Sequence, residues 1–351
     1  MMFFASDNGG PVHPRIMEAL ARANDGYAMP YGADALMEQV RARLRAAFEA
    51  PEAEIFLLTS GTAANALILA SLVRPYETIL CSPDAHVFDD ECGAPEFYTG
   101  GARLAPIAAE AGRIRPEALA ARLASRSRDV HQGRDGALSL TNLTEAGTLY
   151  SADEIAHLAG IAHDHGLAVH LDGARLANAL VASGASLADM TWRAGVDAVS
   201  FGATKNGAMG VEAAVFFKKG GTAQWARDFA FRRMRGGHLL SKHRYLSAQM
   251  AAYLEGDLWL ELAGHANAMN RELVSGLAGL EGVELLHPAP GNIAFARFSR
   301  ARHQRLLAAG ARYYVMDGDP QHGAPDEMLT ARLVCGWSTT PDSVQRLLAA
   351  F

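Results

Sequence analysis

Short apolar runs alternate with helical stretches through the middle of the chain. The runs predict β-strands at residues 54–59, 78–81, 137–141, 167–172, 198–201 and 213–217. A helical stretch over 63–73 follows the first run. Ser151 and Glu154 form a capping box that opens a helix ending near His165, just before Gly166. Strands separated by helices predict an α/β fold, with a mostly parallel sheet covered by helices on both faces.

The two ends of the chain lack the regular alternation of strands and helices. Residues 1–45, with a helix predicted from about Ala35 to Phe48, are interpreted as an N-terminal arm. Beyond residue 240, a long helical segment over 246–277 precedes strand-like pieces at 294–298 and 331–335 and a closing helix from Pro341. The predicted organisation is therefore an arm (1–45), a large domain (46–245) and a small C-terminal α+β domain (246–351).

Composition narrows the class of protein. The chain has 351 residues, 50% of them hydrophobic and 20% charged, which excludes wholesale disorder. A net charge of −6 argues against a dedicated nucleic-acid or membrane-surface protein, and no apolar run approaches the roughly 18 residues of a membrane span. Three cysteines, no C-x-x-C pair and no basic lead-in at the N-terminus favour the reducing cytoplasm.

Four short motifs follow predicted strands, where open α/β sheets bind their ligands. Each also has a plain structural interpretation: a helix cap, an Asp capping the next helix, a solvated Lys, or a structural His. They are Thr59-Ser60-Gly61-Thr62, His170-Leu-Asp172-Gly-Ala-Arg175, Ser200-Phe-Gly-Ala-Thr204-Lys205 and Asp84-Ala-His86.

Taken together, the motifs indicate a pyridoxal-phosphate site. Free amides and hydroxyls at a helix start form an anion cradle for the phosphate. An Asp that ends an apolar strand needs a cationic partner, and a protonated pyridine nitrogen is one. A Lys among small residues can bind the cofactor aldehyde covalently.

With these motifs the sequence resembles the low-specificity L-threonine aldolases, in the β-eliminating lyase group of pyridoxal-phosphate enzymes of fold type I. The resemblance extends over nearly the whole chain. Besides the four motifs above, it rests on Phe4-Ala-Ser6-Asp7-Asn8 with His13-Pro14, on Tyr31-Gly-Ala-Asp34, and on the extension of the cradle motif to Asn65. It implies a mostly parallel, seven-stranded-type sheet flanked by helices, plus a small C-terminal domain.

The resemblance also implies roles for particular residues. Lys205 binds the cofactor covalently, Asp172 pairs with the pyridine nitrogen, and His86 stacks on the ring near the substrate β-hydroxyl. The cofactor-binding set is completed by Ser60, Gly61, Thr62, Arg175 and Thr204. The substrate carboxylate is held by Ser6, Arg175 and Arg332, with Tyr31 contributed by a neighbouring subunit of a homotetramer.

Two stretches depart from the commonest family pattern. Residues 235–242 replace a glycine-rich stretch, so the cation that completes the phosphate site is either Arg235 or Lys242. Residues 141–148 are more like those of the phenylserine aldolases, which favours tolerance of bulky β-substituents.

The predicted reaction is retro-aldol cleavage of an L-β-hydroxy-α-amino acid to glycine and an aldehyde. The nearest alternative is another fold-type I enzyme, a β-eliminating lyase or an aminotransferase. A nucleotide-dependent oxidoreductase would require G-x-G-x-x-G after the first strand, which residues 60–65 do not provide. A non-catalytic binding protein is a third interpretation. No metal is predicted, because His163 and His165 face different sides of their helix.

Overall fold

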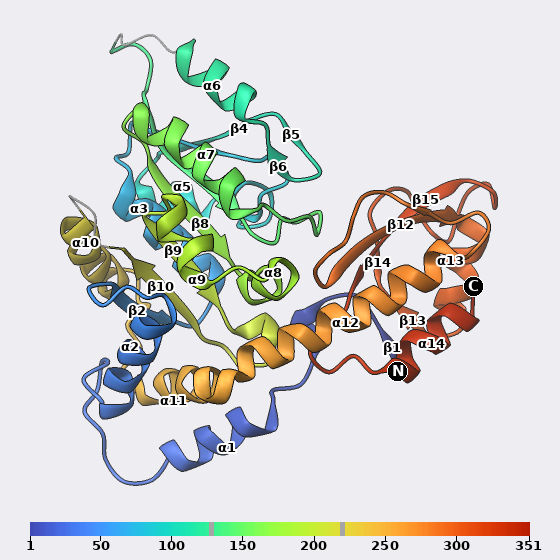
Figure 1. The fold of residues 1–351 in the computed structure, drawn as a ribbon, viewed down its shortest axis with the longest axis horizontal. Coiled ribbons are helices and arrows are strands. Elements are labelled where there is room, and N and C mark those ends of the chain that lie inside the picture. Colours follow the sequence, from blue (N-terminus) through green and yellow to red (C-terminus); the bar gives the residue numbers. More distant parts are fainter. Residues whose placement is uncertain (126–129, 218–221) are drawn as a thin grey trace.

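A seven-stranded sheet forms the centre of the larger part of the molecule (Figure 1). The computed structural model describes residues 1–125, 130–217 and 222–351. Six strands run parallel, and β10 lies antiparallel to both of its neighbours. From one edge to the other the strands are β2 (Glu54–Leu58), β10 (Glu212–Phe216), β9 (Ala198–Gly202), β8 (Ala168–Gly173), β7 (Asp135–Thr141), β3 (Thr78–Cys81) and β4 (Arg103–Pro106).

Alternating side chains of the strands enter two separate hydrophobic cores. In β2, Ile55 and Leu57 join the core on one face of the sheet, while Leu58 joins the core on the other face. Val215 and Phe216 of β10 divide in the same way. This period of two is what a sheet covered on both faces requires, and it confirms the predicted helix–sheet–helix arrangement.

Helices cover both faces. On one side α3 (Gly61–Leu72) lies against the sheet, with α5 (Ala94–Thr99) and α10 (Thr222–Arg235) packed beside it. The core of the other side takes in α2 (Ala35–Ala47), α6 (Pro116–Ala124), α7 (Ala152–Asp164), α8 (Leu176–Ser183), α9 (Leu187–Met190) and α11 (Arg244–Leu254). The capping box predicted at Ser151 and Glu154 is present at the start of α7.

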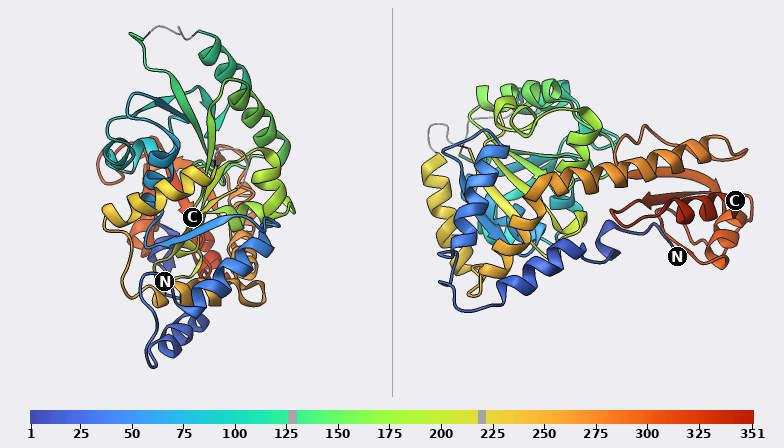
Figure 2. Two further views of the ribbon diagram at one scale, coloured as in Figure 1. Left: turned by 90° about the vertical axis from the view of Figure 1, so that its left-hand side faces the viewer. Right: turned by 60° about the horizontal axis from the view of Figure 1, so that its bottom comes forward.

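The C-terminal part is a smaller α+β unit. Its antiparallel sheet has the order β11 (Glu284–Leu285), β12 (Ile293–Ser299), β15 (Met328–Val334) and β14 (Tyr314–Val315). Its helices are α13 (Arg300–Ala308), α14 (Pro341–Ala349) and the end of α12 (Leu258–Ala278), which bridges the two parts of the molecule (Figures 1 and 2). The fold class predicted from the sequence is confirmed.

The prediction of one helical segment over 246–277 is wrong in detail. The chain forms two helices, α11 and α12, separated by the 3₁₀ turn η4 (Glu255–Asp257). Gly256 and Asp257 adopt positive φ angles of 59° and 55°, which interrupt the helical path. The break lets α11 pack against α1 (Pro14–Ala23) and α2, while α12 turns toward the C-terminal unit.

The first residues of the chain are attached to this C-terminal unit. β1 (Met2–Phe3) pairs in parallel with β13 (Ala311–Arg312), and Phe4 exchanges backbone hydrogen bonds with Arg312 and Val334. The short 3₁₀ turn η1 (Asp7–Gly9) then leads toward α1.

Five further elements complete the described chain, namely α4 (His86–Asp89), the hairpin strands β5 (Ala109–Glu110) and β6 (Arg113–Ile114), and two 3₁₀ turns, η2 (Trp192–Ala194) and η3 (Thr204–Asn206). Within the described ranges, no helix is both long enough and apolar enough to cross a bilayer.

Candidate functional site

Four parallel strands end at one edge of the central sheet, and the predicted site residues follow them. β2 leads to Ser60, β3 to His86, β8 ends around Asp172, and β9 leads to Lys205. Because β10 runs the other way, it begins at this same edge with Glu212, which pairs with Leu58 and Gly202 in the ladder. The topology therefore gathers the sequence motifs in one place.

The start of α3 is built as an anion cradle. The Ser60 side chain caps the helix, because its hydroxyl accepts from the Ala63 N–H at 3.2 Å. At Gly61 an added Cβ would meet no atom within 4 Å, so the space beside the helix start is open. Thr62 is half-buried at the next position. Backbone amides at the start of this twelve-residue helix, with two hydroxyls nearby, suit a phosphate group.

Asp172 is a buried carboxylate with a donor on each oxygen. The Asn65 side-chain amide donates to Oδ2 at 2.8 Å, and the Ala174 N–H donates to Oδ1 at 2.9 Å. Burial would raise the pKa of Asp172, but the Lys205 ammonium and the Ala174 amide hold it below the usual 3.8. Asp172 is therefore ionised at neutral pH and available to pair with a cationic ring nitrogen.

His86 is connected to Asp172 through two intervening side chains. Its Nδ1 lies 2.9 Å from Oε1 of Glu91, and the same Glu91 oxygen accepts from the Asn65 amide at 3.0 Å. The hydrogen bond with Glu91 raises the pKa of His86 above its usual 6.5, against the opposing effect of burial. We call Asn65, His86, Glu91 and Asp172 the cofactor cluster.

Lys205 lies in η3, a turn that Glu212 stabilises through hydrogen bonds. The buried Glu212 carboxylate accepts from the Ala203 N–H at 2.9 Å and also hydrogen-bonds Thr204. The Thr204 hydroxyl in turn accepts from the Val211 N–H at 3.2 Å. Burial raises the pKa of Glu212 to about 7, although these hydrogen bonds and Lys205 oppose the shift. The half-buried Lys205 thus lies in a turn that is fixed by hydrogen bonds and is close to the cofactor cluster.

Two arginines and one carboxylate form a second group, which we call the carboxylate cluster: Asp7, Arg175 and Arg332. The Arg175 Nε and Nη2 donate to the two oxygens of Asp7 at 2.7 and 3.0 Å, and both side chains are buried. Burial would raise the pKa of Asp7, but Arg175 holds it below 3.8. Two of the three guanidinium nitrogens of Arg175 are therefore already engaged.

Arg332 is held less tightly by hydrogen bonds than Arg175. Its Nη1 donates to the Ala5 carbonyl at a long 3.4 Å, and the side chain is half-buried on β15. Burial and the nearby Arg175 lower the pKa of Arg332 from 12.5, which leaves it charged at neutral pH. Asp7 and Glu145 both offset part of the repulsion between the two cations, and two guanidinium groups side by side are suited to an added carboxylate.

The other predicted residues have different surroundings. Ser6 precedes Asp7, and its hydroxyl accepts from the Asn8 N–H at 3.1 Å. Tyr31 is 52% exposed, and in this chain its N–H donates to the Ser241 carbonyl rather than contacting the arginines. Arg235 and Lys242, the two candidates for the phosphate cation, are both exposed.

Sequence reasoning missed the residues that hold the site together. Asn65 and Asp7 lie inside the recognised motifs but received no role, and Glu91 and Glu212 were not singled out. Asn65 reaches a partner 107 positions away, and Asp7 a partner 168 positions away. A signal for Asn65 was available, since a polar side chain within the apolar helix 61–72 must find a partner.

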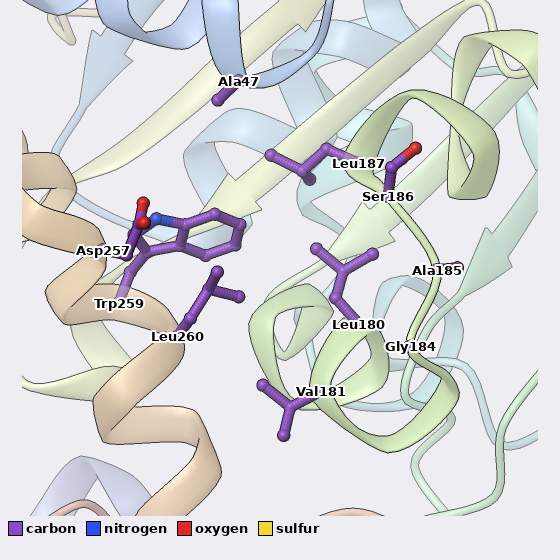
Figure 3. A pocket seen from close by; sticks show the side chains of 10 residues that line it. All are labelled: Ala47, Leu180, Val181, Gly184, Ala185, Ser186, Leu187, Asp257, Trp259 and Leu260. Atoms are coloured by element: carbon purple, nitrogen blue, oxygen red, sulfur yellow. The ribbon is translucent and has the colours of Figure 1, made fainter.

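A surface pocket elsewhere does not coincide with this site. It lies between α8, the α8–α9 connection and the start of α12, and its lining is largely apolar (Figure 3). Asp257 is the one titratable side chain among its ten lining residues. The chemistry-bearing groups therefore lie at the sheet edge and not in this pocket.

Comparison with known proteins agrees with this geometry. The family model described as beta-eliminating lyase matches residues 4–299. This chain belongs to the beta-eliminating lyase family. It is 37% identical over 344 residues to the low specificity L-threonine aldolase of Pseudomonas aeruginosa, covering 98% of this chain and 95% of that protein. A second such aldolase, from a Pseudomonas species, is 36% identical over 346 residues, which is 99% of this chain and 96% of that protein.

Solved structures show the same architecture. A structure of Leishmania major threonine aldolase superposes with a TM-score of 0.90 and 26% identity, covering 99% of this chain and 98% of that one. A Thermus thermophilus aspartate aminotransferase has a TM-score of 0.70 and 16% identity, with 100% and 95% covered, and shows the fold alone.

Pyridoxal phosphate is the cofactor of this family, and the residues present fit it. The open helix start at Gly61, the buried ionised Asp172 and the half-buried Lys205 offer the phosphate, ring-nitrogen and aldehyde partners that the cofactor needs.

Proposed function

We propose that this protein cleaves L-β-hydroxy-α-amino acids between Cα and Cβ, giving glycine and an aldehyde. The observation that carries the proposal is the adjacency of the two clusters: η1, which begins at Asp7, packs against η3, which carries Lys205, and Arg175 follows Asp172 by three residues. Lys205 accordingly acts electrostatically on Asp172, His86 and Asp7. A cofactor site thus borders a pair of arginines suited to an amino-acid carboxylate. The names of the Pseudomonas relatives support the same activity.

Each cluster has its own task in this reaction. Lys205 holds the cofactor, and Asp172 keeps the ring nitrogen protonated. Pyridoxal phosphate, when bound, accepts the electron pair left at Cα when the Cα–Cβ bond breaks. His86 takes the proton from the β-hydroxyl, so that this oxygen becomes the carbonyl of the departing aldehyde. A proton returned to Cα completes glycine.

The carboxylate cluster decides which bond at Cα breaks. The bond at Cα that reacts would be the one whose electrons the bound cofactor can accept, and the position of the substrate carboxylate would select it. Within the described residues Arg332 donates one long hydrogen bond, to the Ala5 carbonyl, and so has N–H groups left for a bidentate contact. Arg175, fixed by Asp7, adds charge and its Nη1, which lies 3.9 Å from Glu145. Orientation of this kind lowers a reaction barrier by roughly several kcal/mol.

For the substrate we propose L-threonine, L-allo-threonine and the bulkier L-phenylserine. The sequence of the loop at 141–148, which is more like that of the phenylserine aldolases, supports L-phenylserine. This loop lies beside the carboxylate cluster, since Glu145 Oε2 is 3.9 Å from Arg175 Nη1. β-Elimination or transamination would use the same Lys205 and Asp172, and no observation favours either reaction over retro-aldol cleavage.

The experiment is to follow aldehyde release from the three L-substrates, with the D-forms as controls. We expect aldehyde from the L-forms alone. A yellow protein that releases no aldehyde from any L-form would contradict the proposed reaction while leaving the cofactor site in place.

We also propose that the protein is a cytoplasmic homotetramer in which Tyr31 completes a neighbouring subunit's site. The exposed apolar side chains of Tyr27, Met29 and Tyr31 on one loop support association. Light scattering on the purified protein should give four times the 37.4 kDa chain mass. A monomer would contradict this assembly.

A further inference from the structure

Glu91 is a buried carboxylate to which the proposed reaction gives no direct role. Its side chain is fully buried, whereas that of His86 is 29% exposed. Burial raises the pKa of Glu91, although the hydrogen bonds from His86 and Asn65 oppose the shift. A carboxylate in such a place costs free energy unless its partners compensate. The function of Glu91 is therefore inferred from its hydrogen-bond partners, His86 and Asn65.

Both partners of Glu91 meet the same oxygen. Oε1 lies 2.9 Å from His86 Nδ1 and 3.0 Å from Asn65 Nδ2, while Oε2 is buried and has no hydrogen-bond partner among the described residues. The NH₂ group of Asn65 can only donate, so Oε1 accepts from it. An ionised Glu91 carboxylate can only accept, and its contact with His86 then requires the His86 proton to sit on Nδ1.

Asn65 keeps Glu91 in this position by joining it to the ring-nitrogen partner. Its NH₂ group donates to Glu91 at 3.0 Å and to Asp172 at 2.8 Å, so it separates two carboxylates that would otherwise repel each other. Turning the amide over would place its oxygen against both carboxylates, which fixes the amide orientation. The arrangement runs from Asp172 through Asn65 and Glu91 to His86.

We propose that Glu91 is a positioning residue that holds the proton of neutral His86 on Nδ1 and so leaves Nε2 free as the base. An acceptor behind one ring nitrogen orients the other nitrogen toward the reacting group, as in other histidine bases. The inference rests on the proposed function for the use of Nε2, but the position of the proton is a property of the protein without substrate.

The charged groups around His86 define the expected pH behaviour. Glu91 and Asp172 favour its protonated form, while burial and Lys205 oppose it. A base must be neutral to work, so kcat/KM should rise with pH through an apparent pKa above the usual 6.5 of histidine. Removing the Glu91 charge should move this rise to lower pH.

The test uses the full-length holoenzyme labelled with ¹⁵N-histidine, at a pH where His86 is neutral. Long-range proton–nitrogen spectra distinguish Nδ1–H from Nε2–H, and the His86→Gln variant identifies the signal among the 13 histidines. In the unmodified protein we expect the Nδ1–H form. Finding the Nε2–H form there would overturn the proposal whether or not any variant folds.

Two variants extend the test. Glu91→Gln should lower the apparent pKa of His86, weaken the preference for Nδ1–H, and reduce kcat/KM by about 10²-fold with cofactor content unchanged. Glu91→Asp, which keeps the charge, should retain more of the pKa shift than Glu91→Gln. The control is Asp90→Asn, an exposed carboxylate one residue away, which should leave all three readouts unchanged.

A merely structural Glu91 gives a different result. Glu91→Gln would then lower stability or cofactor content while the proton stays on Nδ1 and the pKa of His86 stays in place, and this outcome contradicts the proposal. If the protein releases no aldehyde, the proposed function fails, but the tautomer measurement still decides the role of Glu91.

Discussion

The cofactor cluster and the carboxylate cluster lie side by side but are built differently. Every member of the cofactor cluster comes from the central sheet or from the segments directly after its strands. The carboxylate cluster is assembled from three parts of the chain: Asp7 from the N-terminal segment, Arg175 from the start of α8, and Arg332 from the small C-terminal sheet. One cluster lies within the larger part of the molecule, whereas the other forms only where the N-terminal segment and the C-terminal unit meet that part.

The residues that we expect to support electron acceptance and proton transfer therefore lie in the larger part of the molecule. Those that we expect to orient the substrate lie where this part meets the N-terminal segment and the C-terminal unit. Asp7 is held at the junction by the Asn292 side chain, which also donates to the Cys335 carbonyl at 2.8 Å. Changes in the cofactor cluster should therefore lower kcat. Changes in the carboxylate cluster should raise KM and respond to how firmly the C-terminal unit is seated.

The largest expected effect is that of Lys205→Ala. It removes the covalent attachment of the cofactor, so turnover should be abolished and the absorbance band of bound cofactor should change. Full activity of this variant would overturn the assignment of both clusters.

Asp172→Asn should come next, with a fall in kcat of about 10²–10³-fold and little change in KM. The neutral amide no longer keeps the ring nitrogen protonated, while the arginines remain in place. Steady-state kinetics with L-threonine separate the two parameters. A rise in KM at unchanged kcat would break the division between the clusters.

Arg332→Ala should raise KM and lower kcat/KM by about 10–100-fold, which corresponds to losing a charge-assisted hydrogen bond of about 1.5–3 kcal/mol. Arg332→Lys keeps the charge but not the planar pair of donors, so it should recover only part of the loss. Equal activity of the Ala variant and the unmodified protein would show that Arg175 suffices.

Asp7→Asn should act mainly on stability. It removes the charge that pairs with the buried Arg175, and Glu145 remains 3.9 Å away. The free energy of unfolding should therefore fall by up to about 3–5 kcal/mol, and Tm should fall with it. The control is Asp342→Asn, an exposed partner of Arg346 at 3.7 Å, which should change stability by less than about 1 kcal/mol.

Asp7→Asn should also change how the stability of the protein depends on pH. Because the folded-state pKa of Asp7 is held below 3.8, its contribution is complete above the unfolded value and is lost as the pH falls through the folded one. Thermal unfolding at pH 7 and pH 3 should show a smaller acid loss for Asp7→Asn than for the unmodified protein. An equal acid loss would contradict this role of Asp7.

Apolar runs predicted six of the seven strands of the central sheet, because a sheet covered on both faces produces short apolar runs such as that of β3. The edge strand β4, none of whose residues is buried, was not predicted. The break between α11 and α12 was missed, since the apolar pattern continues across Gly256 and Asp257. The site motifs were recognisable because they follow strands directly. Glu91 and Glu212 were not, because a buried carboxylate is defined by contacts that the local sequence does not record.

The most direct test of the whole account is a product balance with L-threonine. The account predicts glycine and acetaldehyde in equal amounts, with no ammonia released, and no products from Lys205→Ala. Ammonia with an oxo acid in place of glycine would contradict the cleavage of the Cα–Cβ bond on which the roles of both clusters depend.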